Sequence, residues 1–202
     1  MARVIGLSGP QGGGKTTLLN GLKKKGLAID DFKVSRQVQA ELGWDSLENA
    51  TKNIGTMIAF QEKIQSVKHA RDKQNQARTD VDIILTERTF ADIACYTQLW
   101  TWELVHAGAW TVQEGIAFAL PFVEECMQLQ LLYDGVIHLP SMPHVQWQTD
   151  PHRAKFEHVS YITEQLDSFF DRKQPKSVPV FRVTEGSVEG RINQTYNWIK
   201  TL

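Results

Sequence analysis

The chain has 202 residues, of which 42% are hydrophobic and 22% charged, and its formal net charge is −1. This length suits one α/β domain, and the composition is ordinary for a globular protein. The near-neutral charge argues against a broad basic surface for long DNA or RNA, so we expect a small-molecule ligand.

Two further features bear on location. No run approaches the ~20 apolar residues that a membrane-spanning helix needs, and the chain begins directly with a predicted strand, so we expect neither a membrane partner nor a signal peptide. Cys95 and Cys126 lie in apolar, helix-like surroundings. They fit buried thiols in a reducing compartment, which predicts a cytoplasmic protein without a structural metal site.

Predicted strands alternate with predicted helices along the whole chain. In chain order we expect a strand at Arg3–Ser8, a helix at 14–25, a strand at 32–35, a helix-rich stretch at 36–79, a strand at 81–86, helices at 91–106 and 112–132, strands at 135–139 and 178–183, and a helix at 189–200. This alternation predicts a five-stranded parallel sheet with right-handed crossovers. Ligands of such sheets bind outside the carboxyl ends of the strands.

A phosphate-binding motif follows the first predicted strand. Residues 9–16 read Gly-Pro-Gln-Gly-Gly-Gly-Lys-Thr, which matches G-x-x-x-x-G-K-[ST] in full, and Thr17 comes next. Such a loop between a strand and a helix turns its N–H groups toward a phosphate, and the helix N-terminus adds partial positive charge. The candidate nucleotide-binding residues are Gly9, Gln11, Gly12, Gly13, Gly14, Lys15, Thr16 and Thr17. The motif predicts ATP or another nucleoside triphosphate, with Lys15 on the β/γ-phosphates and the Thr16 hydroxyl on Mg²⁺.

An acid–arginine pair ends the third predicted strand, in the order Thr86-Glu87-Arg88-Thr89. A carboxylate at this place can reach the Mg²⁺ shell or accept a proton from an attacking hydroxyl. An arginine beside it can clamp acceptor oxygens or charge in the transition state. We therefore predict catalytic roles for Lys15, Glu87 and Arg88, and metal contacts for Thr16 and Glu87.

These residues resemble the P-loop nucleoside and nucleotide kinases, and most of all the group of ribosylnicotinamide kinases and phage-encoded kinases. The resemblance rests on the phosphate loop, on Glu87-Arg88, and on Asp92 and Tyr96 downstream. It implies a three-layer P-loop sandwich with a helical lid, and phosphoryl transfer from ATP with Mg²⁺. It also implies that Arg36, Gln61, Arg88, Asp92 and Tyr96 bind the acceptor.

One position departs from the pattern of these kinases, which usually carry a carboxylate at the end of strand two, three residues before the arginine. Lys33 stands there in this chain. Asp30 or Asp31 could substitute from a shifted register, or Glu87 could serve alone as the base. The departure leaves open which carboxylate acts as base and which acceptor is used.

The stretch 140–176 is polar and interrupted by proline, and we expect it to form the lid of a single domain, 1–202. Arg153 is the candidate that meets the γ-phosphate when the lid closes. Trp100, Trp102 and Trp110 near the helix junction predict core packing or a subunit contact, with an acceptor-stacking surface as the alternative.

The sequence therefore predicts an ATP- and Mg²⁺-dependent kinase for a nucleoside or a (deoxy)nucleoside monophosphate, with a homodimer as a possible assembly. One alternative is a kinase that phosphorylates a modified base in DNA, which would make nucleic acid the partner. Others are a P-loop NTPase that works as a switch, and a regulatory protein that binds nucleotide without turnover. Motor and AAA-type ATPases usually end the third strand with apolar residues and Asp, whereas residues 83–88 here fit the kinase pattern better.

Overall fold

The structure is a computed structural model, and it describes residues 1–141 and 158–202. Its elements in chain order are β1 Arg3–Ser8, α1 Lys15–Lys24, β2 Ala28–Asp30, α2 Val34–Glu41, η1 Leu47–Thr51, α3 Ile54–Gln76, β3 Ile83–Glu87, α4 Phe90–His106, α5 Val112–Leu129, η2 Gln130–Leu132, β4 Gly135–His138, α6 His158–Arg172, β5 Val180–Arg182 and α7 Val188–Ile199. The α/β class and the five parallel strands predicted from the sequence are confirmed.

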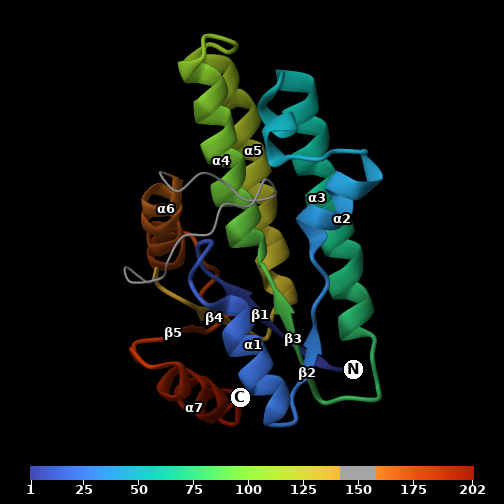
Figure 1. Ribbon diagram of the computed structural model, residues 1–202, viewed down its shortest axis with the longest axis vertical. Coiled ribbons are helices and arrows are strands. Elements are labelled where there is room, and N and C mark those ends of the chain that lie inside the picture. Colours follow the sequence, from blue (N-terminus) through green and yellow to red (C-terminus); the bar gives the residue numbers. More distant parts are fainter. Residues whose placement is uncertain (142–157) are drawn as a thin grey trace.

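The sheet has the order β2-β3-β1-β4-β5, so the strand that leads into the phosphate loop lies at its centre (Figure 1). In the register of the strands, Leu7 lies opposite Glu87 and Ser8 opposite His138. The ends of β1, β3 and β4 therefore meet at one edge of the sheet, where the site residues of the first and third strands come together.

Alternating side chains bury both faces of the sheet. Val4, Ile84 and Val136 point into the larger core, which α3, α4, α5 and α6 complete. Their neighbours Ile5, Leu85 and Ile137 point the other way, against α1 and α7. This period of two, with apolar residues on both faces, is typical of a central parallel sheet and produces three layers. In Figure 1, α1 and α7 lie below the strands while α3, α4 and α5 extend above them.

The second strand lies earlier than predicted. We expected it at 32–35, but β2 covers Ala28–Asp30 and Val34 already begins α2. The strand follows directly on Gly26, whose φ of 89° ends the first helix. The apolar residues 27–29 lead into the edge of the sheet, where β2 pairs with β3. Residues 32–35, where the strand was expected, therefore lie in the connection to α2 and at the start of that helix.

A polar cluster is buried under the end of β3. Lys68 of α3 donates to Asp72 at 2.6 Å and to Thr86 Oγ1 at 2.7 Å, and the hydroxyl of Tyr133 donates to Asp72 at 2.7 Å. All the polar atoms in these contacts have a partner, as burial requires. The cluster fixes Thr86, and with it the following Glu87, against α3.

Candidate active site

The phosphate loop has the backbone that its glycines predict. Gly12 and Gly14 have φ values of 76° and 83°, which favour glycine strongly. A Cβ at Gly9 would approach the carbonyl oxygen of Leu139 to 2.7 Å, so this position also needs a residue without a side chain. The loop therefore holds its shape through positions where other residues would be strained or would clash.

Lys15 points back into this loop. Its Nζ donates to the carbonyl oxygens of Gly9 and Pro10 at 2.6 and 2.7 Å, and the side chain is buried. Burial is the main cause that lowers the pKa of Lys15 to about 8, and the nearby charge of Arg88 adds to it. The ammonium is thus held at the mouth of the loop, where a bound triphosphate would pair with it and raise its pKa again.

The candidate carboxylate Glu87 is engaged by a cation. Lys33, between β2 and α2, forms an ion pair with Glu87 at the end of β3. Burial raises the pKa of Glu87, but the charges of Lys15 and Lys33 outweigh this effect and hold the pKa below its usual value. Glu87 is therefore ionised at neutral pH, which suits a contact to metal-bound water better than a proton-accepting role.

Arg88 is held by its backbone as well as its side chain. Its φ of 69° is the one positive value among the described non-glycine residues, and its N–H donates to Leu7 at 2.9 Å. The guanidinium lies 4.8 Å from the centre of the Tyr96 ring. Burial opposes its charge, but Tyr96, Asp92 and Glu87 together raise the pKa of Arg88, so it remains a cation. Such backbone strain is found where the surrounding structure fixes a functional side chain.

Asp92 caps α4 and also contacts the phosphate loop. Its Oδ2 accepts from the N–H and hydroxyl of Thr89 at 2.9 Å each, while its Oδ1 accepts from the Gly9 N–H at 3.3 Å. Arg88 Nη1 lies 3.6 Å from the same Oδ1. Asp92 therefore couples the loop, the helix and the arginine.

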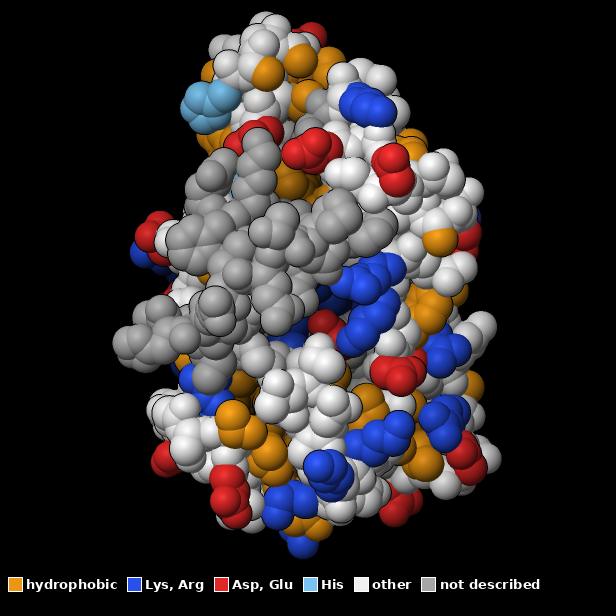
Figure 2. Space-filling model, viewed as in Figure 1, with side chains coloured by type: hydrophobic (Ala, Val, Ile, Leu, Met, Phe, Trp, Pro, Cys, Tyr) orange, Lys and Arg blue, Asp and Glu red, His pale blue; other side chains and the backbone are white. Residues whose placement is uncertain are grey.

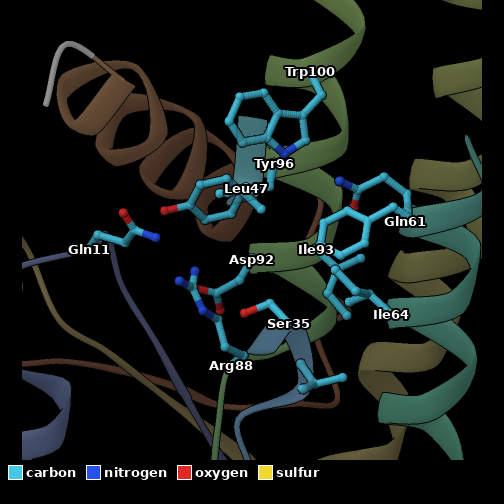
Figure 3. Close-up of a pocket in the computed structure, with 12 residues that line it drawn as sticks. Gln11, Ser35, Leu47, Gln61, Ile64, Arg88, Asp92, Ile93, Tyr96 and Trp100 are labelled. Carbon is cyan, nitrogen blue, oxygen red and sulfur yellow. The ribbon is translucent and has the colours of Figure 1, made fainter. Parts of the chain in front are cut away.

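A pocket opens beside this group, with Arg88 and Asp92 in one wall (Figure 3). Its empty volume is about 480 Å³, a figure that includes space open to solvent. The lining residues are Gln11, Val34, Ser35, Leu47, Phe60, Gln61, Ile64, Arg88, Asp92, Ile93, Tyr96 and Trp100. Most of these side chains are apolar or aromatic, and the polar ones other than Gln61 gather on the side of the phosphate loop.

Two polar atoms at this pocket have no protein partner. Gln11 Oε1 and Arg88 Nη1 are buried and make no hydrogen bond among the described residues. In Figure 3 the Gln11 amide and the Arg88 guanidinium approach one another from opposite sides of the pocket. A buried donor without an acceptor is costly, and a bound ligand with oxygen atoms would satisfy it.

The structure brings together most of the acceptor-site residues that the sequence named. Gln61, Arg88, Asp92 and Tyr96 line one pocket, and Gln61 is buried, accepting from Thr97 at 3.1 Å. Arg36 lies on the exposed side of the first turns of α2, outside this lining. Thr16 is exposed in the first turn of α1, where its hydroxyl can reach a metal ion. Arg153 lies outside the described residues.

Asp30, which the sequence suggested as a substitute base, lies away from the pocket. Asp30 is buried at the end of β2, where Arg71 donates to both of its oxygens at 2.9 Å and Asn75 donates at 2.6 Å. These donors lower the pKa of Asp30 against the opposing effect of burial. Asp30 therefore joins β2 to α3 and does not line the pocket.

Lys33, Ser35, Leu47 and Trp100 are site members that sequence analysis missed or placed elsewhere. In the sequence, Lys33 was noted only because it departs from the pattern of the kinases. In the structure its side chain forms an ion pair with Glu87, a candidate catalytic residue. Trp100 was expected in the core or at a subunit contact, with an acceptor-stacking surface as the alternative; it is 7% exposed in the core and also lines the pocket. The spacing of Asp92, Tyr96 and Trp100 at i, i+4 and i+8 on one helix face was the available signal.

Two searches of the described residues, 1–141 and 158–202, found no candidates. No helix there is long and apolar enough to cross a bilayer. No three His, Cys, Asp or Glu side chains there converge as metal ligands.

Comparisons with known proteins agree with this architecture. Residues 4–191 match the family model AAA_28, described as an AAA domain. No curated protein matches significantly. Among solved structures, a deoxyadenosine kinase from M. mycoides with bound dCMP and dCDP products is similar over 98% of this chain and 100% of its own, with a TM-score of 0.65 at 16% identity. Another crystal structure of this kinase has dATP bound and aligns with a TM-score of 0.66 at 16% identity, covering 98% of this chain and 99% of its own.

A thymidylate kinase from Candida albicans is similar over 99% of this chain and 92% of its own, with a TM-score of 0.67 at 12% identity. Identities this low establish the fold alone, since one fold serves many functions. The family match covers nearly the whole chain. The chain therefore belongs to the AAA_28 family of AAA domains, and its fold is that of the P-loop nucleoside and nucleotide kinases.

Proposed function

We propose that this protein is an ATP- and Mg²⁺-dependent kinase that transfers the γ-phosphoryl group to a nucleoside or a (deoxy)nucleoside monophosphate. One observation carries the proposal: the phosphate loop and the pocket share a wall, because Asp92 contacts Gly9 while lining the pocket with Arg88. A phosphoryl donor in the loop and an acceptor in the pocket would meet at this wall. A switch that only hydrolyses nucleotide needs no such second pocket.

The pocket lining suits a nucleobase. Phe60, Tyr96 and Trp100 offer flat apolar surfaces, and the Gln61 amide offers both a donor and an acceptor to the edge of a base. The polar end of the pocket, at Arg88, would then face the phosphate loop. This orientation places the sugar of a bound nucleoside or nucleotide next to the γ-phosphate.

The donor side would work mainly by position and charge. The loop N–H groups and Lys15 would hold the phosphates, and the unpartnered Arg88 Nη1 would meet oxygens of the transferring group. Thr16 and Glu87 would hold Mg²⁺ together with phosphate oxygens and water, which is the usual mixed coordination of this ion. The metal would offset negative charge that builds up between donor and acceptor.

The lid is part of the proposal as well. We propose a single domain, 1–202, with a lid at 140–176 that delivers Arg153. Residues 142–157 lie outside the described ranges. Within the proposed lid segment, α6, His158–Arg172, packs against α4 and buries Ile162, Leu166 and Phe169 in the core, so this helix would be the fixed part that anchors such a lid.

Location in the cytoplasm is also proposed. Cys95 and Cys126 are buried free thiols, and burial raises the pKa of Cys126 to about 12, so it stays protonated and unreactive. Thiols of this kind suit a reducing compartment.

The test is a screen of ADP formation with Mg²⁺ and ATP against nucleosides, deoxynucleosides, their 5′-monophosphates and ribosylnicotinamide, each with and without DNA. We expect one class of small acceptor to stimulate ADP formation without DNA. Stimulation only by DNA that carries a modified base would favour the DNA-kinase alternative. ADP formation that no acceptor changes would favour a switch, and absence of ATP binding would end the proposal.

A further inference from the structure

The junction of phosphate loop and pocket carries more cations than free carboxylates. Lys15, Lys33 and Arg88 lie close enough to one another that the charges of Arg88 and Lys33 both depress the pKa of Lys15. Figure 2 shows Lys and Arg side chains gathered over the start of α2, beside an acidic one. This excess of positive charge bears on what the acceptor brings to the site.

The carboxylates near the junction are all engaged. Glu87 pairs with Lys33, and Asp92 accepts from Thr89 and Gly9 and lies beside Arg88. Asp30 accepts from Arg71 and Asn75, away from the pocket. A carboxylate that is stabilised as an anion by such donors is a weak proton acceptor. The described part of the chain therefore offers no carboxylate suited to removing a proton from a sugar hydroxyl.

Lys33 and Arg88, in contrast, have further N–H groups that can donate to a ligand. An ammonium carries three N–H donors, and Glu87 takes one from Lys33. The Lys33 side chain is 40% exposed, so its other donors can reach a ligand. Arg88 Nη1 is buried at the pocket and makes no hydrogen bond to the described residues, although Asp92 Oδ1 lies 3.6 Å away. Arg88 lines the pocket and Lys33 directly precedes the lining residue Val34, so both cations have donors available beside the proposed acceptor site.

We propose that the acceptor is a nucleoside 5′-monophosphate, held by Lys33 and Arg88 through its phosphate, and that the neutral nucleoside is not an acceptor. This inference rests on the proposed kinase function and names its acceptor class. The phosphate monoester has a second pKa of about 6, so at pH 7 its oxygens are largely ionised and nucleophilic without a base. A sugar hydroxyl would need to lose its proton, and Glu87, Asp92 and Asp30 are each engaged by other residues.

The transfer step then needs no proton acceptor. An ionised oxygen of the monophosphate forms a bond to the γ-phosphorus of ATP, and the bond from this phosphorus to the β,γ-bridging oxygen breaks. ADP leaves with the electron pair, and the product is a nucleoside diphosphate with a new phosphoanhydride bond. Lys33 and Arg88 offset the repulsion between two anionic phosphates, which is the main obstacle to their approach.

The experiment compares each deoxynucleoside with its own 5′-monophosphate, at equal concentration, with ATP and Mg²⁺. We expect ADP formation with monophosphates only, and phosphorus NMR of the product should show a phosphoanhydride. Faster turnover of a nucleoside than of its monophosphate would overturn the inference while leaving the kinase proposal intact. Protein that binds no ATP would overturn both.

Variants of Lys33 test its assigned contact. Lys33→Met should weaken monophosphate binding in calorimetric titrations by about 10- to 100-fold, the range for a hydrogen bond to a charged group, with ATP binding nearly unchanged. Lys23→Met is the matched control, because Lys23 is exposed in the last turn of α1, at the end of this helix away from the phosphate loop. Equal monophosphate affinity in wild type and folded Lys33→Met protein would overturn the assignment.

Discussion

Asp92 joins the phosphate loop to the pocket: its Oδ1 accepts from the Gly9 N–H at 3.3 Å and lies 3.6 Å from Arg88 Nη1. One side chain therefore positions a donor loop, a helix start and an arginine together. Because these contacts converge on a fully buried carboxylate, changes at this residue should affect both activity and stability.

Asp92→Asn keeps the size of the side chain but removes its charge, so Arg88 loses its partner. We expect kcat/KM to fall at least tenfold with a modest loss of stability, about 1–2 kcal/mol through the weakened helix cap. Glu114→Gln is the control, because Glu114 occupies the same capping position on α5 but is exposed and remote. Equal activity of the two variants would contradict the coupling role of Asp92.

Lys15→Ala should abolish phosphoryl transfer while the protein stays folded, because it removes the cation that would meet the β/γ-phosphates. A turnover assay checks the loss of phosphoryl transfer, and a thermal melt on the same sample checks that the protein is folded. Lys24→Ala, at an exposed position on the same helix, is the control. Near-normal turnover by a folded Lys15→Ala protein would remove the basis for the kinase proposal.

The pKa of Lys15 predicts a dependence of stability on pH. Burial lowers this pKa from 10.5 to about 8, so between these values the unfolded chain holds a proton that the folded protein has released. Stability then rises with pH across this window, with a slope of at most about 1.4 kcal/mol per pH unit from this group.

Urea unfolding from pH 7 to 10 should show this trend in the wild type relative to Lys15→Met, which lacks the group. ATP affinity should fall over the same range, because the neutral amine no longer attracts phosphate. A constant difference in the free energy of unfolding between the two proteins would show that Lys15 titrates normally.

Glu87→Gln should lower kcat far more than it weakens ATP binding. The amide cannot hold metal-bound water as the carboxylate does, and it leaves Lys33 without its anion. Glu41→Gln removes a carboxylate from an exposed pair with Lys63 and serves as the control. A loss confined to the KM for ATP would contradict the assigned role.

Lys68→Met should destabilise the protein by about 3–5 kcal/mol, because it leaves the Asp72 carboxylate buried without its cation. The double variant Lys68→Met/Asp72→Leu should recover part of this loss, since both charges are then gone. Lys63→Met, which removes half of an exposed pair, should change stability by no more than about 1 kcal/mol. Equal losses of stability in Lys68→Met and Lys63→Met would show that the buried ion pair contributes no more to stability than the exposed one.

Local patterns predicted the elements whose signals lie within a few residues. The glycine motif after an apolar strand predicted the phosphate loop, and the period of apolar residues predicted α4 and α7 to within one residue at each end. The prediction at 32–35 was wrong because β2 is an edge strand of three residues, too short for a period to be recognised.

The assembly of the pocket required the tertiary structure. Gln61 and Trp100 lie on different helices, and their meeting depends on how α3 and α4 pack over the sheet. The exposed place of Arg36 on α2 likewise depends on where this helix begins, and its role toward an acceptor stays a prediction.

The sequence by itself determined the phosphate loop, the parallel α/β sheet and the acid–arginine pair at the end of β3, because each depends on residues adjacent in the chain. Only the tertiary structure decided the charge of the site. Lys33 and Glu87 lie 54 positions apart, and they meet because β2 and β3 run parallel as neighbours and end at the same edge. Coulomb attraction between side chains acts through space, so no pattern along the chain could reveal that Glu87 is held as an anion by Lys33.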